Sequence, residues 1–252
     1  MTGPSNQRPP RPALLAVEDL RVAYGKAQVV HGASFSVGQG EFVVMLGRNG
    51  AGKSTILHAI SGLIPAHGRV VLAGQDMSHM PARQRVQAGI VPVLEGHRVF
   101  TSLSVEDNLL IGTYANHPRG DRSKLGRIYD LFPELAERRQ LQASRLSGGQ
   151  QQILAVAQGV IAEPRLLILD EPSGGLAPIV VDRILKVASG LCETGVAVLL
   201  VEQLVEKALR HADYGYLLET GRIVGEGTSA TLHEGTMLER VYLGGHIEPA
   251  GP

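Results

Sequence analysis

Residues 47–54 read G-R-N-G-A-G-K-S and match the phosphate-loop pattern G-x-x-x-x-G-K-[ST] at every fixed position. An apolar run at 42–46 precedes them and an apolar-spaced segment at 56–63 follows, which predicts a strand, a glycine loop and a helix in the order this motif requires. An ordinary glycine-rich turn is the alternative, and four constrained positions in this context argue against it. The stretch therefore predicts a nucleoside triphosphate as the ligand.

Each part of the loop has a physical task in binding phosphate. Its glycines let backbone N–H groups turn toward the ligand, and the helix that starts there adds free N–H groups and the positive end of its dipole. Lys53 would place a charge beside the β- and γ-phosphates, and the Ser54 hydroxyl would ligate Mg²⁺. The nucleotide-binding residues predicted in this stretch are Gly47, Arg48, Asn49, Gly50, Ala51, Gly52, Lys53, Ser54 and Thr55.

A second motif, L-L-I-L-D-E-P at 166–172, ends an apolar run with two adjacent carboxyl groups. A continuous apolar run predicts a buried parallel strand, and catalytic groups gather at the carboxyl ends of such strands. Asp170 would hold Mg²⁺ through water, and Glu171 would polarise the attacking water. Capping of the helix predicted after Pro178 is the alternative use of these acids, but the phosphate loop upstream favours catalysis.

Two further segments point to the same chemistry. The apolar run at 197–201 predicts another buried strand, which places Gln203 at its carboxyl end and facing the expected site. Residues 146–150 read L-S-G-G-Q and run into a helical pattern. A serine N-cap followed by two glycines exposes N–H groups at a helix start, so Ser147, Gly148, Gly149 and Gln150 form a second predicted anion-binding surface, with an ordinary capped helix as the alternative.

Composition excludes several classes of protein. The 252 residues contain 24 Lys plus Arg and 24 Asp plus Glu, so no overall basic field points to a nucleic-acid partner. The single cysteine, Cys192, excludes an internal disulfide, fits a reducing cytosol and is expected to pack rather than react. No apolar run approaches the ~20 residues that cross a bilayer, and no signal-peptide core is present. A role at a membrane would therefore require docking onto a protein that spans it.

The pattern along the chain predicts one α/β unit with flexible ends. Residues 1–13 are expected to be a disordered tail, residues 14–245 the folded domain, and residues 246–252 a flexible C-terminus. Short strands are predicted before and after the phosphate loop, and a helical texture takes over at about 101–164. A helical insert within a sheet-rich domain follows from this change of pattern.

The order of phosphate loop, L-S-G-G-Q and L-L-I-L-D-E-P resembles the ATP-binding cassette (ABC) family over about residues 15–245. The resemblance implies a P-loop NTPase core with an antiparallel β subdomain and an inserted helical subdomain. It also implies a head-to-tail dimer, in which each ATP lies between one phosphate loop and the partner's segment at 147–149. Tyr24 would stack on adenine by the same resemblance, whereas its sequence context leaves a partly buried strand tyrosine equally open.

Further segments resemble LivF-type ATPases, which belong to importers of branched-chain amino acids. The segments at 95–100, 171–178 and 201–203 are similar to E-G-R-R-V-F, E-P-S-x-G-L-A-P and V-E-Q of those proteins. Glu95 stands where most cassettes carry a glutamine, which implies a place at the nucleotide and its metal ion. Gln203 stands where most cassettes carry a histidine.

Three positions depart from the LivF-type pattern. Leu94 replaces a proline, His97 replaces an arginine, and Leu204 replaces an asparagine. The first two flank Glu95 and bear on the path of that loop. None of the three touches the assignment of ATP binding.

The resemblance implies an ATPase that energises uptake of branched-chain or related hydrophobic amino acids at the cytoplasmic face of the cell membrane. Its expected cofactors are ATP and Mg²⁺, and its expected partners are a second ABC ATPase of the same or a related chain, two integral membrane permease subunits and, indirectly, an extracytoplasmic solute-binding protein. An importer of urea or short amides is the nearest alternative.

Two other classes fit less well. A soluble ABC ATPase of translation or DNA repair would carry two cassettes or a long coiled-coil insert, and the sequence shows neither. A nucleotide-binding regulator without turnover would not need the intact set of Lys53, Asp170 and Glu171.

Overall fold

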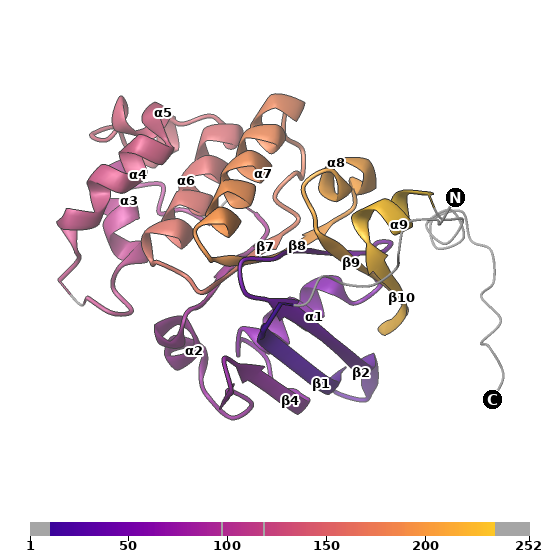
Figure 1. Cartoon of the computed structure of the whole chain (residues 1–252). Helices are drawn as coiled ribbons and strands as arrows, with labels where there is room; N and C mark the ends of the chain where they lie inside the picture. The colour runs from indigo at the N-terminus through magenta and orange to yellow at the C-terminus, as the bar shows by residue number, and fades with distance from the viewer. Residues whose placement is uncertain (1–10, 97, 118, 235–252) are drawn as a thin grey trace, which may run out of the picture.

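The computed structural model of the chain describes residues 11–96, 98–117 and 119–234. These residues form two β-sheets, with helices between and above them (Figure 1). The expected C-terminal tail at 246–252 and most of the expected tail at 1–13 lie outside the described residues. The end of the latter is described, and there Ala13 already begins the first strand.

The smaller sheet is antiparallel and has the strand order β2-β1-β4-β5. Its strands are β1 (Ala13–Tyr24), β2 (Ala27–Gly38), β4 (His67–Leu72) and β5 (Gln75–Asp76). Apolar side chains of β1 alternate with exposed ones, as expected for a sheet with one face on the core. Two long strands before the phosphate loop therefore build a separate layer.

The larger sheet has the order β10-β9-β3-β8-β7-β6, and its strands from β9 to β6 run parallel. Its strands are β3 (Phe42–Leu46), β6 (Ile90–Val93), β7 (Leu166–Asp170), β8 (Ala197–Glu202), β9 (Tyr214–Glu219) and β10 (Arg222–Thr228). Every residue of β3, β7 and β8 is buried, which explains their continuous apolar runs. The last strand, β10, returns antiparallel beside β9.

The order of elements sets one group of helices apart from the others (Figure 1). All four α-helices from α3 to α6 lie between β6 and β7 in the chain, within the stretch expected to be a helical insert. The helices are α1 (Lys53–Ile60), α2 (Ala82–Ala88), α3 (Val105–Gly112), α4 (Leu125–Leu131), α5 (Pro133–Ala136), α6 (Gly148–Ile161), α7 (Pro178–Glu193), α8 (Val205–Leu209) and α9 (Ser229–Glu234), with 3-10 turns at Arg122–Lys124 and Ala143–Arg145.

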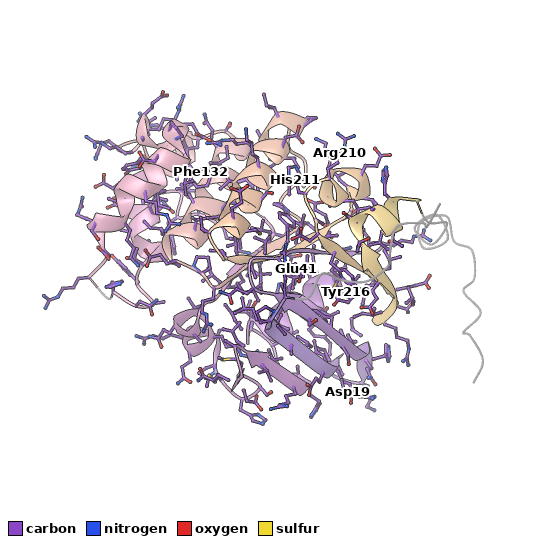
Figure 2. All side chains as sticks on the ribbon, viewed as in Figure 1. Asp19, Glu41, Phe132, Arg210, His211 and Tyr216 are labelled. Carbon is purple, nitrogen blue, oxygen red and sulfur yellow. The ribbon has the colours of Figure 1, made fainter. Side chains whose placement is uncertain are left out.

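The larger sheet separates two hydrophobic cores. Val43 and Met45 of β3 point to the core shared with α1 and the smaller sheet, whereas Val44 and Leu46 point to the core shared with α3 to α8. Figure 2 shows Phe132 among the upper helices and Tyr216 on the side of the smaller sheet. The two cores cover both faces of β3, β8 and β7, and the carboxyl ends of these three neighbouring parallel strands lie side by side.

Two of the shorter helices have clear N-terminal ends. Leu204, directly before α8, has φ −79° and ψ 75° and is not helical. Pro81 is the N-cap of α2. Among the described residues, no helix is long and apolar enough to span a bilayer, the longest being the 16 residues of α7.

Candidate nucleotide-binding site

The phosphate loop joins β3 to α1 through an unusual backbone. Gly50 has φ +79° and Gly52, the N-cap of α1, has φ +102°, both in the left-handed region that a side chain disfavours. A Cβ on Gly47 would lie 2.4 Å from the carbonyl oxygen of Leu218. No side chain caps α1, so the start of this helix keeps its N–H groups for a ligand.

Lys53 is the first residue of α1, and its side chain is only 3% exposed. Its ammonium group donates to the carbonyl oxygens of Gly47 at 2.9 Å and Arg48 at 3.2 Å. The same nitrogen lies 3.2 Å from a carboxylate oxygen of Glu171, which is 16% exposed. The loop therefore holds one buried positive charge and brings the catalytic carboxylate predicted from the second motif directly to it.

The predicted catalytic residues follow two neighbouring strands. β7 and β8 pair with Asp170 opposite Val201, and the Glu171 N–H extends this ladder by donating to the Val201 carbonyl at 3.0 Å. Gln203 then donates through its amide to a Glu171 carboxylate oxygen at 2.5 Å. Capping does not account for the acids, because α7 begins at Pro178 with Ala177 as its N-cap and no side-chain cap.

Asp170 is 2% exposed and lies beside the start of α1. It accepts a hydrogen bond from the Ser54 hydroxyl at 3.0 Å. Burial raises the pKa of Asp170, with the Ser54 hydrogen bond and His58 opposing the rise and the carboxyl groups of Glu171 and Glu95 adding to it. A cation beside this buried carboxylate would offset the cost of its burial.

The oxygen atoms present fit a magnesium ion. The Ser54 hydroxyl and the Asp170 carboxylate meet at 3.0 Å, and Ser54 and Glu95 line one cavity. Mg²⁺ prefers one or two such oxygen ligands, completed by water and substrate phosphates. The described residues contain no cluster of three or more His, Cys, Asp or Glu side chains that could hold a metal ion by themselves. The Ser54 and Asp170 oxygens fit an ion whose remaining ligands are water and phosphate.

A cavity of about 410 Å³ gathers half of the predicted site residues. It is lined by Val29, Asn49, Gly50, Gly52, Lys53, Ser54, Thr55, Glu95, Glu171 and Gln203. An adjoining cavity of about 280 Å³ is lined by Arg48, Asn49, Gly50, Ala51, Leu218, Glu219 and Thr220. Residues from five separate segments of the chain thus meet at the phosphate loop.

Tyr24 is a predicted site residue that does not join the residues around the phosphate loop. It ends β1 with its side chain 50% exposed, and it does not line either of the two cavities at the phosphate loop. Its half-exposed position at the end of a strand is compatible with the alternative of a partly buried strand tyrosine. Stacking on adenine remains a prediction for this exposed ring.

The second predicted anion-binding surface lies elsewhere. Ser147 caps α6, accepting from the Gln150 N–H at 3.3 Å while Gln150 accepts from the Ser147 N–H at 3.0 Å. Gly148 and Gly149 follow in the first turn of α6, which belongs to the helical layer in Figure 1. None of the four residues lines the cavities at the phosphate loop.

Sequence reasoning missed two residues of this site. Val29 lines the main cavity from β2, and His58 lies on α1 with its Nε2 3.9 Å from an Asp170 oxygen. His58 follows Ser54 by four residues, a spacing that puts both on one face of a helix and could have indicated it. No sequence pattern indicated Val29, because the pairing of β2 with β1 brings it to the cavity.

Residues 30–174 match the protein family described as "ABC transporter", and they contain the phosphate loop, the α6 start and the Asp170–Glu171 pair. The chain belongs to this family. The ABC chain is 40% identical over 233 residues to the high-affinity branched-chain amino acid transport ATP-binding protein BraG of Pseudomonas aeruginosa, covering 92% of this chain and 100% of that protein.

Other comparisons agree with this membership. The ABC chain is 34% identical to the probable branched-chain amino acid transport ATP-binding protein LivF of Archaeoglobus fulgidus, with 92% and 99% of the two chains covered. It also matches the ADP conformation of an ATP-binding cassette of an ABC transporter with a TM-score of 0.81 at 24% identity, covering 92% of this chain and 99% of the other. The second match shows the fold alone.

Membership confirms the predicted fold class, the binding of nucleotide and the activity of an ATPase. The chain is an ABC ATPase that hydrolyses ATP. Relatives of this kind are ATP-binding subunits of transporters, which implies membrane permease subunits as partners.

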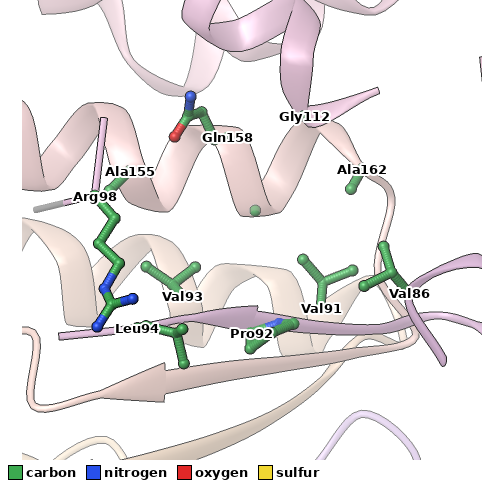
Figure 3. A pocket seen from close by; sticks show the side chains of 11 residues that line it. Val86, Val91, Pro92, Val93, Leu94, Arg98, Gly112, Ala155, Gln158 and Ala162 are labelled. Carbon is green, nitrogen blue, oxygen red and sulfur yellow. The ribbon is translucent and has the colours of Figure 1, made fainter. Parts of the chain in front are cut away.

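Another cavity of the ABC ATPase, also of about 280 Å³, lies beside β6. Figure 3 shows it between β6 and α6, with Leu94 and Arg98 at one end and Val86 and Ala162 at the other. Its lining is mostly apolar, and it shares no residue with the cavity at the phosphate loop. Leu94 lines this cavity while Glu95, the next residue, lines the nucleotide cavity, so one short loop connects the two.

Proposed function

We propose that this ABC ATPase energises the uptake of branched-chain or related hydrophobic amino acids. The observation that carries the proposal is full-length similarity to BraG, at 40% identity and with 100% of that protein covered. The segments around Glu95, Glu171 and Gln203, which follow the LivF-type pattern, support the same assignment. A peripheral position at the cytoplasmic face of the cell membrane belongs to this proposal.

The phosphate loop and its neighbours would bind MgATP. The N–H groups of the loop and Lys53 would contact the β- and γ-phosphates, and Tyr24 would stack on the adenine. Ser54, Asp170 and Glu95 would hold Mg²⁺, which when bound neutralises charge on the phosphate oxygens. The hydrogen bond of 3.0 Å between Ser54 and Asp170 supports this set.

Hydrolysis would depend on Glu171 and Gln203. Glu171 would accept a proton from the attacking water, and its contact with Lys53 at 3.2 Å supports a position beside the γ-phosphate. Gln203 would donate to the γ-phosphate or to the water, since an amide is a donor that does not titrate as histidine does. The 2.5 Å contact between Gln203 and Glu171 supports a shared task.

The active unit would be a head-to-tail pair of cassettes. Ser147, Gly148 and Gly149 lie away from the chain's own nucleotide cavity, and Ser147 and Gly148 are exposed. They would contact ATP held by the phosphate loop of a second ABC ATPase, with Gln150 supporting the turn through its bond to Ser147. The second ATPase would be a related chain or another copy of this one.

Coupling to the permease would run through the loop after β6. Leu94 and Glu95 line different cavities, and Arg98 holds the loop by donating to the Glu95 carbonyl at 3.2 Å. A segment of a permease docked at the cavity of Figure 3 would therefore sense a shift of Glu95 toward nucleotide. Two permease subunits and, indirectly, an extracytoplasmic solute-binding protein complete the proposed assembly.

The decisive experiment isolates the full chain with the membrane proteins that copurify with it, and reconstitutes them in proteoliposomes. Uptake of leucine driven by ATP, with hydrolysis measured in the same vesicles, is the expected result. Uptake of urea or a short amide in place of leucine would assign the alternative importer class. Full ATPase activity of a chain that copurifies with no membrane protein would reject the role in transport.

Two variants test the roles inside that assembly. Glu171→Gln keeps the shape of the side chain but cannot take a proton, so MgATP should bind while hydrolysis becomes very slow. Arg98→Ala should lower uptake while MgATP binding stays near that of the unchanged chain, because Arg98 contacts the loop and not the nucleotide cavity. Turnover of Glu171→Gln at the unchanged rate would place the base elsewhere, and equal loss of ATP binding in Arg98→Ala would remove the coupling role.

A further inference from the structure

Glu202 is a buried acid that the proposed mechanism does not use. It is the last residue of β8, directly before Gln203, and it is 1% exposed. A carboxyl group taken out of water is costly unless hydrogen bonds compensate it. The hydrogen-bond donors around the Glu202 carboxylate therefore indicate its role.

The two carboxylate oxygens of Glu202 accept four hydrogen bonds. Oε1 accepts from the Ser173 N–H at 3.0 Å, and Oε2 accepts from the Ser173 hydroxyl at 2.8 Å. Oε2 also accepts from the N–H groups of Gln203 at 3.0 Å and Leu204 at 3.4 Å. Four donors around two oxygens suit an ionised carboxyl group, which only accepts.

These bonds join the two turns that carry the reacting side chains. The chain leaves β7 at Asp170, and Glu171 has φ +43°, a left-handed conformation that is strained for a residue with a side chain. Ser173 lies two residues later and is bound on both its N–H and its hydroxyl. The second turn begins at Gln203, and its first N–H is bound by the same carboxylate.

We propose that Glu202 is a positioning residue for ATP hydrolysis, whose carboxylate locks the turn of Glu171 to the turn of Gln203. The inference rests on the proposed roles of those two residues. Glu202 does not line the nucleotide cavity, so it acts through its neighbours rather than on the nucleotide. Holding Glu171 in a strained turn at a set distance from Gln203 keeps the base and the amide aligned on one water molecule.

The primary test is Glu202→Gln in the full chain, assayed with the membrane proteins that copurify with it. The amide has one acceptor oxygen and turns an NH₂ group toward backbone N–H donors, so the lock loosens without a large change in volume. We expect kcat to fall about 10- to 100-fold, since displacing a positioned catalytic group by about 1 Å costs on the order of 10²-fold. The KM for MgATP should change less than about twofold, because the phosphate loop is untouched.

Matched variants separate positioning from folding. Glu193→Gln makes the same change at an exposed residue at the end of α7 and should leave kcat unchanged. Ser173→Ala removes the hydroxyl bond and should lower kcat in the same direction but less, while Ser173→Thr retains a hydroxyl and should restore it. The two Ser173 variants test the proposal even if Glu202→Gln fails to fold. A wild-type kcat in Ser173→Ala, or a kcat in Ser173→Thr that stays as low as in the alanine variant, overturns the proposal.

A double variant links the result to Glu171. If Glu202 works by placing Glu171, adding Glu202→Gln to Glu171→Gln should change the residual kcat less than about twofold. A further full loss, or an unchanged kcat in Glu202→Gln alone, overturns the positioning role. Glu171→Gln by itself reports on the proposed function, because normal turnover in that variant shows that the base is elsewhere whatever Glu202→Gln does.

Discussion

Two helices of this ABC ATPase begin at glycine-rich segments, and they begin in different ways. The α1 start uses left-handed glycines and has no side-chain cap. The α6 start uses a reciprocal bond between Ser147 and Gln150, with no positive φ at Gly149. The first start leaves its N–H groups open to a ligand, whereas the second already satisfies part of its own.

The surroundings of the two starts differ as well. Lys53 at the α1 start is buried and meets Glu171, and the cavity there collects residues from several strands. Ser147 and Gly148 at the α6 start are exposed, in the helical layer and away from that cavity. The α1 start is therefore enclosed by residues of several segments, whereas the α6 start is exposed and, under the proposed function, would contact nucleotide held by another chain.

The largest effect is expected from Lys53→Ala. Loss of the buried charge should weaken binding of MgATP to the full chain by about 100-fold, or about 2.7 kcal/mol, and abolish hydrolysis. Isothermal titration measures the affinity, with Lys186→Ala on the exposed face of α7 as control. Nucleotide affinity within about twofold of the unchanged chain would show that the α1 start does not depend on its lysine.

Ser147→Arg should separate binding from hydrolysis. Because Ser147 lies away from the chain's own cavity, the isolated chain should bind MgATP with affinity changed less than about twofold. In the reconstituted complex, the added cation would fill the partner's γ-phosphate site and reduce hydrolysis at least about 10-fold. Ser144→Arg places the same charge three residues earlier and should hydrolyse ATP normally, whereas an active Ser147→Arg complex would contradict the dimer.

Gly50→Ala tests the left-handed backbone of the α1 start without changing a charged or polar side chain. A Cβ there meets no atom within 4 Å, so the expected loss of about 1–2 kcal/mol in unfolding free energy comes from φ +79° alone. Urea denaturation measures it. Gly190→Ala in α7 also meets no atom but has no positive φ, and it should raise the unfolding free energy by about 0.5–1 kcal/mol. An equal change of the unfolding free energy in the two variants would mean that the backbone at Gly50 imposes no cost on a residue with a side chain.

Ser147→Ala gives the smallest expected change. Removal of the cap should lower the unfolding free energy by about 1 kcal/mol, while MgATP affinity of the isolated chain stays the same. Ser147→Thr, which keeps a capping hydroxyl, should lose less stability than the alanine variant. A loss of nucleotide affinity in the isolated Ser147→Ala chain would mean that the α6 start serves the chain's own site.

Local signals in the sequence were sufficient for much of the fold. The strand β3 was predicted from its apolar run, and β7 and β8 were predicted as buried strands from theirs. The start of α6 was predicted from Ser147 and its glycines. Tyr24 was not settled in this way, since its exposure depends on how β1 packs and not on its neighbours in sequence.

The sequence by itself determined the motifs, since a phosphate loop is defined by glycines and a lysine within eight consecutive residues. It also determined the order of strands and helices, because their hydrophobic periods are read over short windows. Only the tertiary structure decided which segments meet. Val29 reached the nucleotide cavity through pairing of β2, and Glu202 bound Ser173 across two strands. Such contacts join residues far apart in the chain, and their geometry depends on the packing of both sheets rather than on any local pattern.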